Sequence, residues 1–396
     1  MRSDKSTSQH FSHLSEIASA AAQGEPALME TLRALVEVES PSDEKAAVDR
    51  CMDLAATMAQ KLGGKIHRHR QKVFGDILEA RFFTSGARGR KPILLLGHLD
   101  TVWPMGTLAK MPFRVAEGRV WGPGTLDMKA GVAMAFTAIG ILNQLPAKQR
   151  RPITLLLVSD EEVGSTASRT ITEKIAQECE AVYVLEPAQG LEPGAYKTAR
   201  KGIGHYRIHV RGVAAHSGVD FGKGHSAIHE LAHQVGIIAG FTELQRGITV
   251  NIGTIQGGSR SNVVAAEASA EVDVRIAKRS DVARVERKFR QLRANDRGCV
   301  LTVEGGLNRP PMERTRGTVA LYRRAKTLAQ NLGFSLQEAA TGGGSDGNFT
   351  SALGIPTLDG MGAVGEGAHA AHESLLVKEL APRTALLTAM LLEPEG

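Results

Sequence analysis

Three consecutive carboxylates follow one of the most apolar stretches of the chain. Residues 153–157 read ITLLL, and Asp160, Glu161 and Glu162 come directly afterwards in the segment VSDEEVGS. Carboxylates this close together repel one another and resist burial. They either turn outwards into water at the end of a strand, or a positive charge lies among them.

Further imidazole and carboxylate side chains follow other apolar segments or lie in loops. His98 and Asp100 follow residues 93–96, Glu186 follows residues 181–185, and Asp127 and His369 lie in the loops GTLDMKAG and GEGAHAAHES. In open α/β sheets, ligands bind beyond the carboxyl ends of the strands. Each residue alone is more often a cap or a turn residue. Together they form a nitrogen and oxygen donor set that suits divalent metals, and two cations would cancel the repulsion among the carboxylates.

A second zinc motif competes with this interpretation. Residues 229–233 read HELAH, which matches the HExxH signature of helical zinc proteases. The third ligand is missing, because Ala239 stands where the longer motif needs a histidine and Glu243 is too close to replace it. The segment is therefore interpreted as the polar face of a helix.

The glycine-rich segment TGGGSDGN, residues 341–348, could suggest a phosphate-binding loop. It lacks the GK[ST] ending of a P-loop, so nucleotide binding is not expected. The alternatives are a flexible loop and a backbone wall beside a substrate carboxylate.

The elements that would position these residues form two groups. Helical patterns at 27–38, 43–62 and 128–145 alternate with apolar strands at 76–82, 93–96, 153–158 and 181–185, which predicts a mostly parallel α/β sheet with flanking helices. From about 205 to 304 the order is strand, helix, strand, strand, helix, strand, the ferredoxin-like βαββαβ unit. We expect a discontinuous catalytic domain, 1–202 and 309–396, that carries an inserted domain, 203–308.

Bulk properties exclude several classes of protein. At 396 residues the chain is long enough for two domains. The net charge of +6 is scattered and aromatics make up only 4%, which argues against nucleic-acid binding. Three distant cysteines without a CxxC motif and an N-terminus without a signal-peptide pattern indicate a cytoplasmic protein. No segment is expected to be long enough to cross a membrane.

A series of motifs in fixed order resembles the aminoacylase/carboxypeptidase family of co-catalytic zinc hydrolases, from about residue 25 to the C-terminus. The longer block LLLGHLDTVWPMGTLAKMPF, residues 94–113, looks most like the glutamate carboxypeptidase (carboxypeptidase G) branch. The motifs are GHLDTV (97–102), GPGTLDMKAG (122–131), SDEEVGS (159–165), LEP (185–187), AAHSG (214–218), SNVVAAEA (261–268), TGGGSDG (341–347) and GEGAHAAHE (365–373).

The resemblance implies two Zn²⁺ ions per chain, with Co²⁺ or Mn²⁺ also suitable. It also implies that Asp100 orients a histidine ligand and that Glu161 is the general base. His369 is preferred to His372 as a ligand, because it stands four residues before Glu373, the spacing usual in the family. The implied ligands are His98 and Glu186 on one metal, Glu162 and His369 on the other, and Asp127 between them.

The resemblance also implies roles for the inserted domain as lid and dimerisation surface. His216 would stabilise the oxyanion, often in the site of the partner subunit. Arg275, Asn262 and the backbone around Gly344 would hold a substrate carboxylate, although Arg275 could instead form a structural ion pair with Asp273. Arg309 could hold a second carboxylate, and Arg200 and Lys201 lie at the hinge as candidates for closing the lid.

The expected function is hydrolysis of an amide or peptide bond that releases a C-terminal amino acid, with glutamate the expected residue. The alternative is an N-acyl-amino-acid deacylase or desuccinylase, of the acetylornithine or succinyl-diaminopimelate type. The expected partners are a small peptide or N-acyl amino acid and a second copy of the chain, with neither nucleic acid nor membrane. A non-catalytic scaffold is disfavoured because all five ligands, Asp100 and Glu161 are present.

Overall fold

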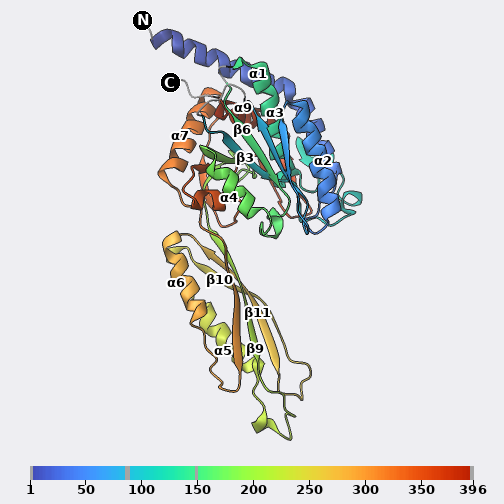
Figure 1. The fold of residues 1–396 in the computed structure, drawn as a ribbon, viewed down its shortest axis with the longest axis vertical. Coiled ribbons are helices and arrows are strands. Elements are labelled where there is room, and N and C mark those ends of the chain that lie inside the picture. Colours follow the sequence, from blue (N-terminus) through green and yellow to red (C-terminus); the bar gives the residue numbers. More distant parts are fainter. Residues whose placement is uncertain (1–2, 85–89, 148–149, 393–396) are drawn as a thin grey trace. The chain divides into compact units, whose positions relative to one another are not determined.

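The computed structural model describes residues 3–84, 90–147 and 150–392 (Figure 1). The chain forms two units. The larger unit contains residues 1–198, 314–341 and 345–396, and the smaller unit contains Ala199–Glu313 together with Gly342–Gly344. The insertion predicted from the sequence, 203–308, lies within this smaller unit and does not include the glycine triplet. The roles assigned to the two parts remain predictions.

A six-stranded sheet lies at the centre of the larger unit. Strands β3 and β6 are buried along their whole length, as expected for parallel strands that are covered on both faces. The strands β6, β3, β7 and β14 run parallel, and β1 and β2 add an antiparallel edge. The order is β1 (Lys65–His69), β2 (Ile77–Phe82), β6 (Ile153–Val158), β3 (Ile93–His98), β7 (Ala181–Val184), β14 (Thr357–Leu358). The predicted mostly parallel α/β fold is confirmed.

Helices flank this sheet, and three of them, α1, α3 and α9, pack on one another (Figure 1). Helix α1 begins at Ser3, well before the predicted start at residue 27. Its buried residues Leu14, Ile17, Ala21 and Leu28 recur every three to seven positions, a helical periodicity that the sequence analysis did not use. The helices are α1 (Ser3–Glu37), α2 (Lys45–Lys61), α3 (Ala130–Gln144), α4 (Arg169–Gln177), α7 (Arg316–Asn331), α8 (Gly347–Ala352) and α9 (Val377–Met390).

One prediction about membranes was too strong. The segment Thr125–Gln144 is long and apolar enough to cross a bilayer, with a hydropathy of 1.4. However, 83% of this window is buried inside the protein. It is therefore a core helix by its packing, and its apolar composition reflects contact with the sheet and with the neighbouring helices.

The smaller unit contains one antiparallel sheet, and helices α5 and α6 pack on it (Figure 1). The chain order is strand, helix, strand, strand, helix, strand, which confirms the predicted ferredoxin-like unit. Alternate residues of β9 and β11 face a core that both helices help to form. The elements are β9 (Gly202–Arg211), α5 (Ala227–Ala239), β10 (Thr249–Gly257), β11 (Glu267–Ile276), α6 (Arg279–Arg290) and β12 (Val300–Arg309), in the sheet order β10-β11-β9-β12.

Short strands that the sequence analysis did not predict connect two loops of the larger unit. Strand β16 pairs antiparallel with both β15 and β5, which brings residues 365–376 beside residues 119–121. The loop of His369 and the segment that leads to Asp127 are thus held by one small sheet. Its strands are β4 (Arg114–Ala116), β5 (Arg119–Trp121), β15 (Gly365–Glu366) and β16 (Ser374–Leu376), and two further strands are β8 (Tyr196–Arg200) and β13 (Glu338–Thr341).

Candidate metal centre

His98 is the last residue of β3, and its imidazole is almost completely buried. Its Nδ1 lies 2.9 Å from the backbone oxygen of Asp100 and 3.4 Å from the Oδ1 of the same residue. These contacts fix the ring so that its other nitrogen, Nε2, lies 3.3 Å from Asp127 Oδ1 and 3.7 Å from Glu186 Oε1. The structure therefore brings together the three side chains that the sequence analysis assigned to one metal.

The second oxygen of Asp127 faces a second imidazole. Asp127 Oδ2 lies 3.4 Å from His369 Nε2, and this nitrogen lies 3.0 Å from Glu162 Oε2. His369 has a φ of 64°, which an L-residue rarely adopts and which is often found at functional sites. The preferred residue His369, rather than the fallback His372, thus contacts the predicted partners.

The geometry and burial of these groups fit divalent cations. In a tetrahedral zinc site with bonds near 2.0–2.1 Å, neighbouring ligand atoms lie about 3.3 Å apart. The nitrogen-to-oxygen distances here are 3.0 to 3.7 Å. His98 Nε2 and Asp127 Oδ1 are buried without a hydrogen-bond partner, although buried polar atoms normally have one. Donor atoms of two overlapping groups, His98 with Asp127 and Glu162, and His98 with Glu161 and Glu186, lie within 4.8 Å of one another.

The pKa values of the two histidines and of Glu162 reflect an excess of negative charge in this site. Burial disfavours the charged form of His98, yet its contacts with Asp100 and Asp127 raise its pKa well above 6.5. Asp127 and Glu162 raise the pKa of His369 to about 10 through hydrogen bonds. Burial raises the pKa of Glu162. A site that holds protons on its imidazoles in this way is one that also attracts metal cations.

Asp100 connects the two strand ends that carry the site. Its carboxylate accepts hydrogen bonds from Ser42 Oγ at 2.8 Å and from the backbone N–H groups of Glu161 and Glu162 at 3.3 and 3.1 Å. It therefore holds the turn Glu161–Val163 beside His98. Asp160, the first of the three consecutive carboxylates, turns away and accepts hydrogen bonds from the N–H groups of residues 167 and 168.

Glu373 is a site residue that sequence reasoning used only as a spacing reference. It is fully buried, and its carboxylate accepts hydrogen bonds from the backbone N–H groups of Gly124, Leu126 and Asp127 and from Trp103 Nε1, at 2.9 to 3.1 Å. Glu373 thus fixes the backbone that presents Asp127. The only sign of Glu373 in the sequence was its position four residues after His369. The residues that donate hydrogen bonds to it lie about 250 positions earlier in the chain.

Three predicted substrate-binding residues gather at one end of the smaller unit. Arg275 and Arg309 both lie opposite Ile203 of β9, and Gly344 lies against Ile203 and Arg309 so closely that a side chain there would clash with both. Arg309 is buried. Arg275 forms a two-pronged ion pair with Asp273, at 2.8 and 2.9 Å, which is the structural alternative named for this residue.

His216 and Asn262 lie together beyond the other end of the same sheet. Ser217 N donates to the backbone oxygen of Asn262 at 3.0 Å, and His216 pairs with residue 263. His216 Nδ1 accepts from Gly218 N at 3.1 Å, so a neutral ring carries its proton on the outward Nε2. The structure therefore separates this pair from Arg275, Arg309 and Gly344.

The HExxH segment does not form a zinc site among the described residues. Glu230 is buried and accepts hydrogen bonds from the N–H groups of Asn295 and Asp296 and from Gln234. It is therefore a structural carboxylate that holds a loop, while His229 and His233 lie exposed on α5. The interpretation of this segment as a polar helix face agrees with these contacts.

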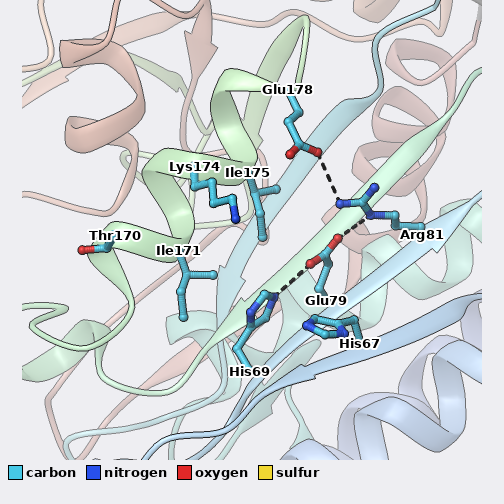
Figure 2. Close-up of a pocket in the computed structure, with 9 residues that line it drawn as sticks. All are labelled: His67, His69, Glu79, Arg81, Thr170, Ile171, Lys174, Ile175 and Glu178. Carbon is cyan, nitrogen blue, oxygen red and sulfur yellow. Dashed lines mark hydrogen bonds and ion pairs between the residues drawn. The ribbon is translucent and has the colours of Figure 1, made fainter.

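A separate pocket of about 490 Å³ lies between the β1–β2 edge and α4 (Figure 2). Its buried carboxylate, Glu79, is paired with His69 and Arg81, and Arg81 also contacts Glu178 at 3.3 Å. None of the predicted site residues lines it. Its acidic groups Glu79 and Glu178 are paired with basic ones.

Comparison with known proteins identifies the family. A model described as Peptidase family M20/M25/M40 matches residues 94–393. Carboxypeptidase G2 of Pseudomonas sp. (strain RS-16) is 28% identical over 385 residues, which cover 95% of this chain and 91% of that protein. A succinyl-diaminopimelate desuccinylase of Magnetococcus marinus is 28% identical over 401 residues, covering 92% and 98%.

A solved structure from Bacillus subtilis, described as a dinuclear metal binding peptidase of family M20, has the same fold. Its TM-score is 0.69 at 16% identity, and the match covers 93% of this chain and 98% of that one. At this identity it supports the fold alone. The family model, however, covers most of the chain and agrees with the resemblance found in the motifs. The chain therefore belongs to peptidase family M20/M25/M40 and is a metal-dependent hydrolase.

Proposed function

We propose that this chain is a two-zinc carboxypeptidase that hydrolyses an amide or peptide bond and releases a C-terminal amino acid. His98 and Glu186 would hold one metal, and Glu162 and His369 would hold the other. Asp127 would bind both metals. One observation carries this assignment: the two carboxylate oxygens of Asp127 face different imidazoles, at 3.3 and 3.4 Å. A carboxylate between two imidazoles is the arrangement that a bridging ligand needs.

Two bound cations would lower the pKa of a water molecule and polarise the scissile carbonyl. The chain supplies the proton transfers. Asp100 holds the backbone N–H of Glu161, so the Glu161 carboxylate stays close to His98 and Glu186. In this position it would take the proton from the attacking water and return it to the leaving amine. Asp100 would also keep Nε2 of His98 directed at the metal.

The substitution Glu161→Gln tests this assignment. It removes the base but keeps the size of the side chain, so we expect turnover to fall by about 10²–10⁴-fold. Metal analysis of the same protein should still give about two ions per chain. Loss of one ion would instead make Glu161 a ligand, a role that its proximity to His98 and Glu186 also allows. Glu178→Gln, at an exposed position, is the matched control and should change neither quantity.

The proposed metal is zinc, with cobalt or manganese as alternatives, because nitrogen and oxygen donors suit all three. Metal analysis of protein purified without added metal, followed by reconstitution with each ion, distinguishes them.

The proposed leaving residue is glutamate. The relative named carboxypeptidase G2 supports this choice, as does Arg309, a buried guanidinium whose side chain lies beside Gly344. Its fork could bind the side-chain carboxylate of a glutamate. Arg309→Met keeps the apolar stem and removes the charge, so kcat/KM for glutamyl substrates should fall about 10-fold or more while neutral substrates change little. Equal losses would remove the glutamate preference.

Deacylation or desuccinylation of an N-acyl amino acid is the second candidate. The desuccinylase relative is as identical to this chain, at 28%, as carboxypeptidase G2 is. A release assay over peptidyl-glutamate, acetylornithine and succinyl-diaminopimelate substrates distinguishes the two candidates, since each predicts a different preferred substrate.

We also propose a homodimer that forms through the smaller unit, located in the cytoplasm. Arg275 and Ala268 lie on β11 opposite Ile203 and Val210 of β9, so seven residues at about 3.3 Å each place them about 23 Å apart. His216 and Asn262 lie beyond Ala268. One substrate would therefore meet His216 of the partner subunit together with Arg275 of its own chain. All three cysteines are unpaired and buried, as expected in a reducing compartment.

A further inference from the structure

The first part of the connection from α1 to α2, residues 38–42, lies alongside the backbone that follows strand β3. Thr101 N donates to Ser40 O at 2.9 Å, and Ser42 N donates to Thr101 O at 3.2 Å. The hydroxyl of Ser40 donates to Leu99 O at 2.6 Å. The backbone that leaves β3 is therefore fixed by residues that stand about 60 positions earlier in the chain.

The hydroxyl of Ser42 contacts the carboxylate of Asp100. It donates to Oδ2 at 2.8 Å, and the same oxygen accepts from the backbone N–H of Glu162 at 3.1 Å. The other oxygen, Oδ1, lies 3.4 Å from His98 Nδ1 and accepts from Glu161 N at 3.3 Å. Ser42 and Asp100 are only 4% and 0% exposed. A rotation of this carboxylate would disturb the histidine and the turn together, and the Ser42 hydroxyl opposes that rotation.

A buried ammonium attaches the loop of Asp127 to the end of α1. Lys129 is 1% exposed, and its Nζ donates to Leu35 O and to Val38 O, each at 2.9 Å. A positive charge beside the last carbonyl groups of a helix is favourable, and a buried ammonium needs such acceptors. Lys129 follows Asp127 by two residues, and its backbone N–H donates to Gly124 O at 3.0 Å. The end of α1 thereby holds the loop that carries Asp127.

The two loops that are held in this way also contact each other. A Cβ added to Gly124 would lie 2.7 Å from Cγ2 of Thr101. Between the two attachment points, the carboxylate of Glu39 accepts hydrogen bonds from two backbone N–H groups of the turn at 106–108, at 2.8 and 2.9 Å. The segment 35–42 therefore supports both loops at once.

We propose that Ser42 and Lys129 are positioning residues that fix the metal centre to the end of α1. Ser42 fixes Asp100, which in turn orients His98. Lys129 fixes the backbone that presents Asp127. The inference rests on the proposed two-metal site and deepens it, because each residue acts on a different part of the site. Ser42 acts on the metal at His98, and Lys129 acts on the ligand that both metals share.

Metal affinity tests the role of Ser42, measured by chelator competition on the full-length, zinc-loaded protein. We expect Ser42→Ala to weaken binding of the ion at His98 about 10-fold or more, as for other residues that orient metal ligands. Ser42→Thr keeps the hydroxyl and should restore most of the affinity. Cobalt-loaded protein gives a second measurement, because the visible absorption of Co²⁺ depends on ligand geometry, and its spectrum should change in Ser42→Ala.

Ser226→Ala is the matched control. The Ser226 hydroxyl accepts from His229 N at 3.3 Å and caps helix α5 in the smaller unit. Its loss should lower stability while leaving both the zinc affinities and the cobalt spectrum unchanged. A drop in metal affinity that merely accompanies lower stability would also be found in this control.

A double-mutant cycle shows whether Ser42 acts through Asp100. In Asp100→Ala protein the hydroxyl has no carboxylate to hold, so adding Ser42→Ala should cause no further loss of metal affinity. If the two losses multiply instead, Ser42 does not act through Asp100 and its positioning role is wrong.

The number of ions affected tests the role of Lys129. Lys129→Met keeps the length of the side chain and removes its charge and donors. Because Asp127 is proposed to bind both metals, we expect both zinc affinities to fall about 10-fold or more, whereas Ser42→Ala weakens one. Lys129→Gln keeps an N–H donor and is the second variant if the methionine protein does not fold. Lys61→Met, at an exposed lysine in the last turn of α2, is the control and should retain both ions.

The outcomes distinguish these positioning roles from the proposed function. If the wild-type protein holds no pair of metal ions, the two-zinc function fails and the positioning roles fail with it. If the wild type holds the pair, but Ser42→Ala and a folded Lys129 variant keep its zinc affinities and its cobalt spectrum, only the positioning roles are wrong.

Discussion

Glu373 is a single buried carboxylate on which the presentation of Asp127 depends. It accepts hydrogen bonds from the backbone N–H groups of Gly124, Leu126 and Asp127 and from the side chain of Trp103. In Glu373→Gln one acceptor oxygen becomes a donor that faces N–H groups. We expect the free energy of unfolding to fall by about 2–4 kcal/mol. We also expect the affinity for metal to fall about 10–100-fold, as for other partners that orient ligands.

Urea unfolding and a metal-chelator competition measure these two effects. Trp103→Phe is the control, because it removes one donor and leaves the three backbone hydrogen bonds in place. It should retain metal affinity within a few-fold. A Glu373→Gln protein with wild-type metal affinity would show that Asp127 needs no such support.

The types of the metal-binding side chains could be predicted from the sequence, but the residues that hold them in place could not. His98 ends strand β3 and Glu162 stands four residues after strand β6, and strand ends of a parallel sheet meet at one edge. The role of Glu373 depends on the pairing of β16 with β5, which joins segments about 250 residues apart. No local pattern encodes such a contact. The bidentate pair of Arg275 with Asp273 was only one of two alternatives before the structure showed it.

At the scale of elements, the β1–β2 edge and α4 surround the buried carboxylate of Glu79 (Figure 2). Burial raises the pKa of Glu79, but hydrogen bonds from Arg81 and His69 outweigh burial and leave the pKa below its usual value. A carboxyl whose folded pKa is lowered stabilises the fold above its unfolded pKa, near 4.5, and loses this contribution as the pH falls through the folded pKa.

The substitution Glu79→Gln should therefore reduce stability most at neutral pH. The side chain is 4% exposed, so we expect a loss of about 1–3 kcal/mol at pH 7 that shrinks below about pH 4. Urea unfolding of both proteins at pH 7 and pH 3.5 measures it. Glu178, the other partner of Arg81, is 52% exposed, so Glu178→Gln should lower the free energy of unfolding by less than about 1 kcal/mol. A loss for Glu79→Gln that is equal at both pH values would contradict this account.

Helices and strands could be predicted where their residues follow a single hydrophobic periodicity. Strand β6 matches the predicted range 153–158, because an uninterrupted apolar run is unambiguous. The two-residue strands β14 and β15 were not predicted, since so few residues carry no periodicity. They form only because longer strands lie beside them.

For the whole molecule, the fold class follows from the order of helices and strands along the chain, but the proposed sharing of His216 between two subunits does not. Within one smaller unit, the His216 and Asn262 pair is more than about 23 Å from Arg275. The proposed function assigns His216 with Asn262, and also Arg275, to the same reaction. The proposed C₂ dimer would resolve this separation, because each site could draw His216 from the partner subunit.

Mixing two inactive variants tests this arrangement. Glu161→Gln protein lacks the base, and His216→Ala protein lacks the oxyanion donor, so each homodimer should be nearly inactive. In a mixed dimer that exchanges His216 between subunits, one site regains an intact Glu161 together with an intact His216. Random subunit exchange makes half of the dimers mixed, so about a quarter of the wild-type rate should return. If His216 serves its own chain, every site in every dimer lacks one group and no activity returns. Light scattering and native mass spectrometry on the same samples verify that dimers formed and exchanged, so an inactive mixture with confirmed exchange would place His216 in its own subunit's site.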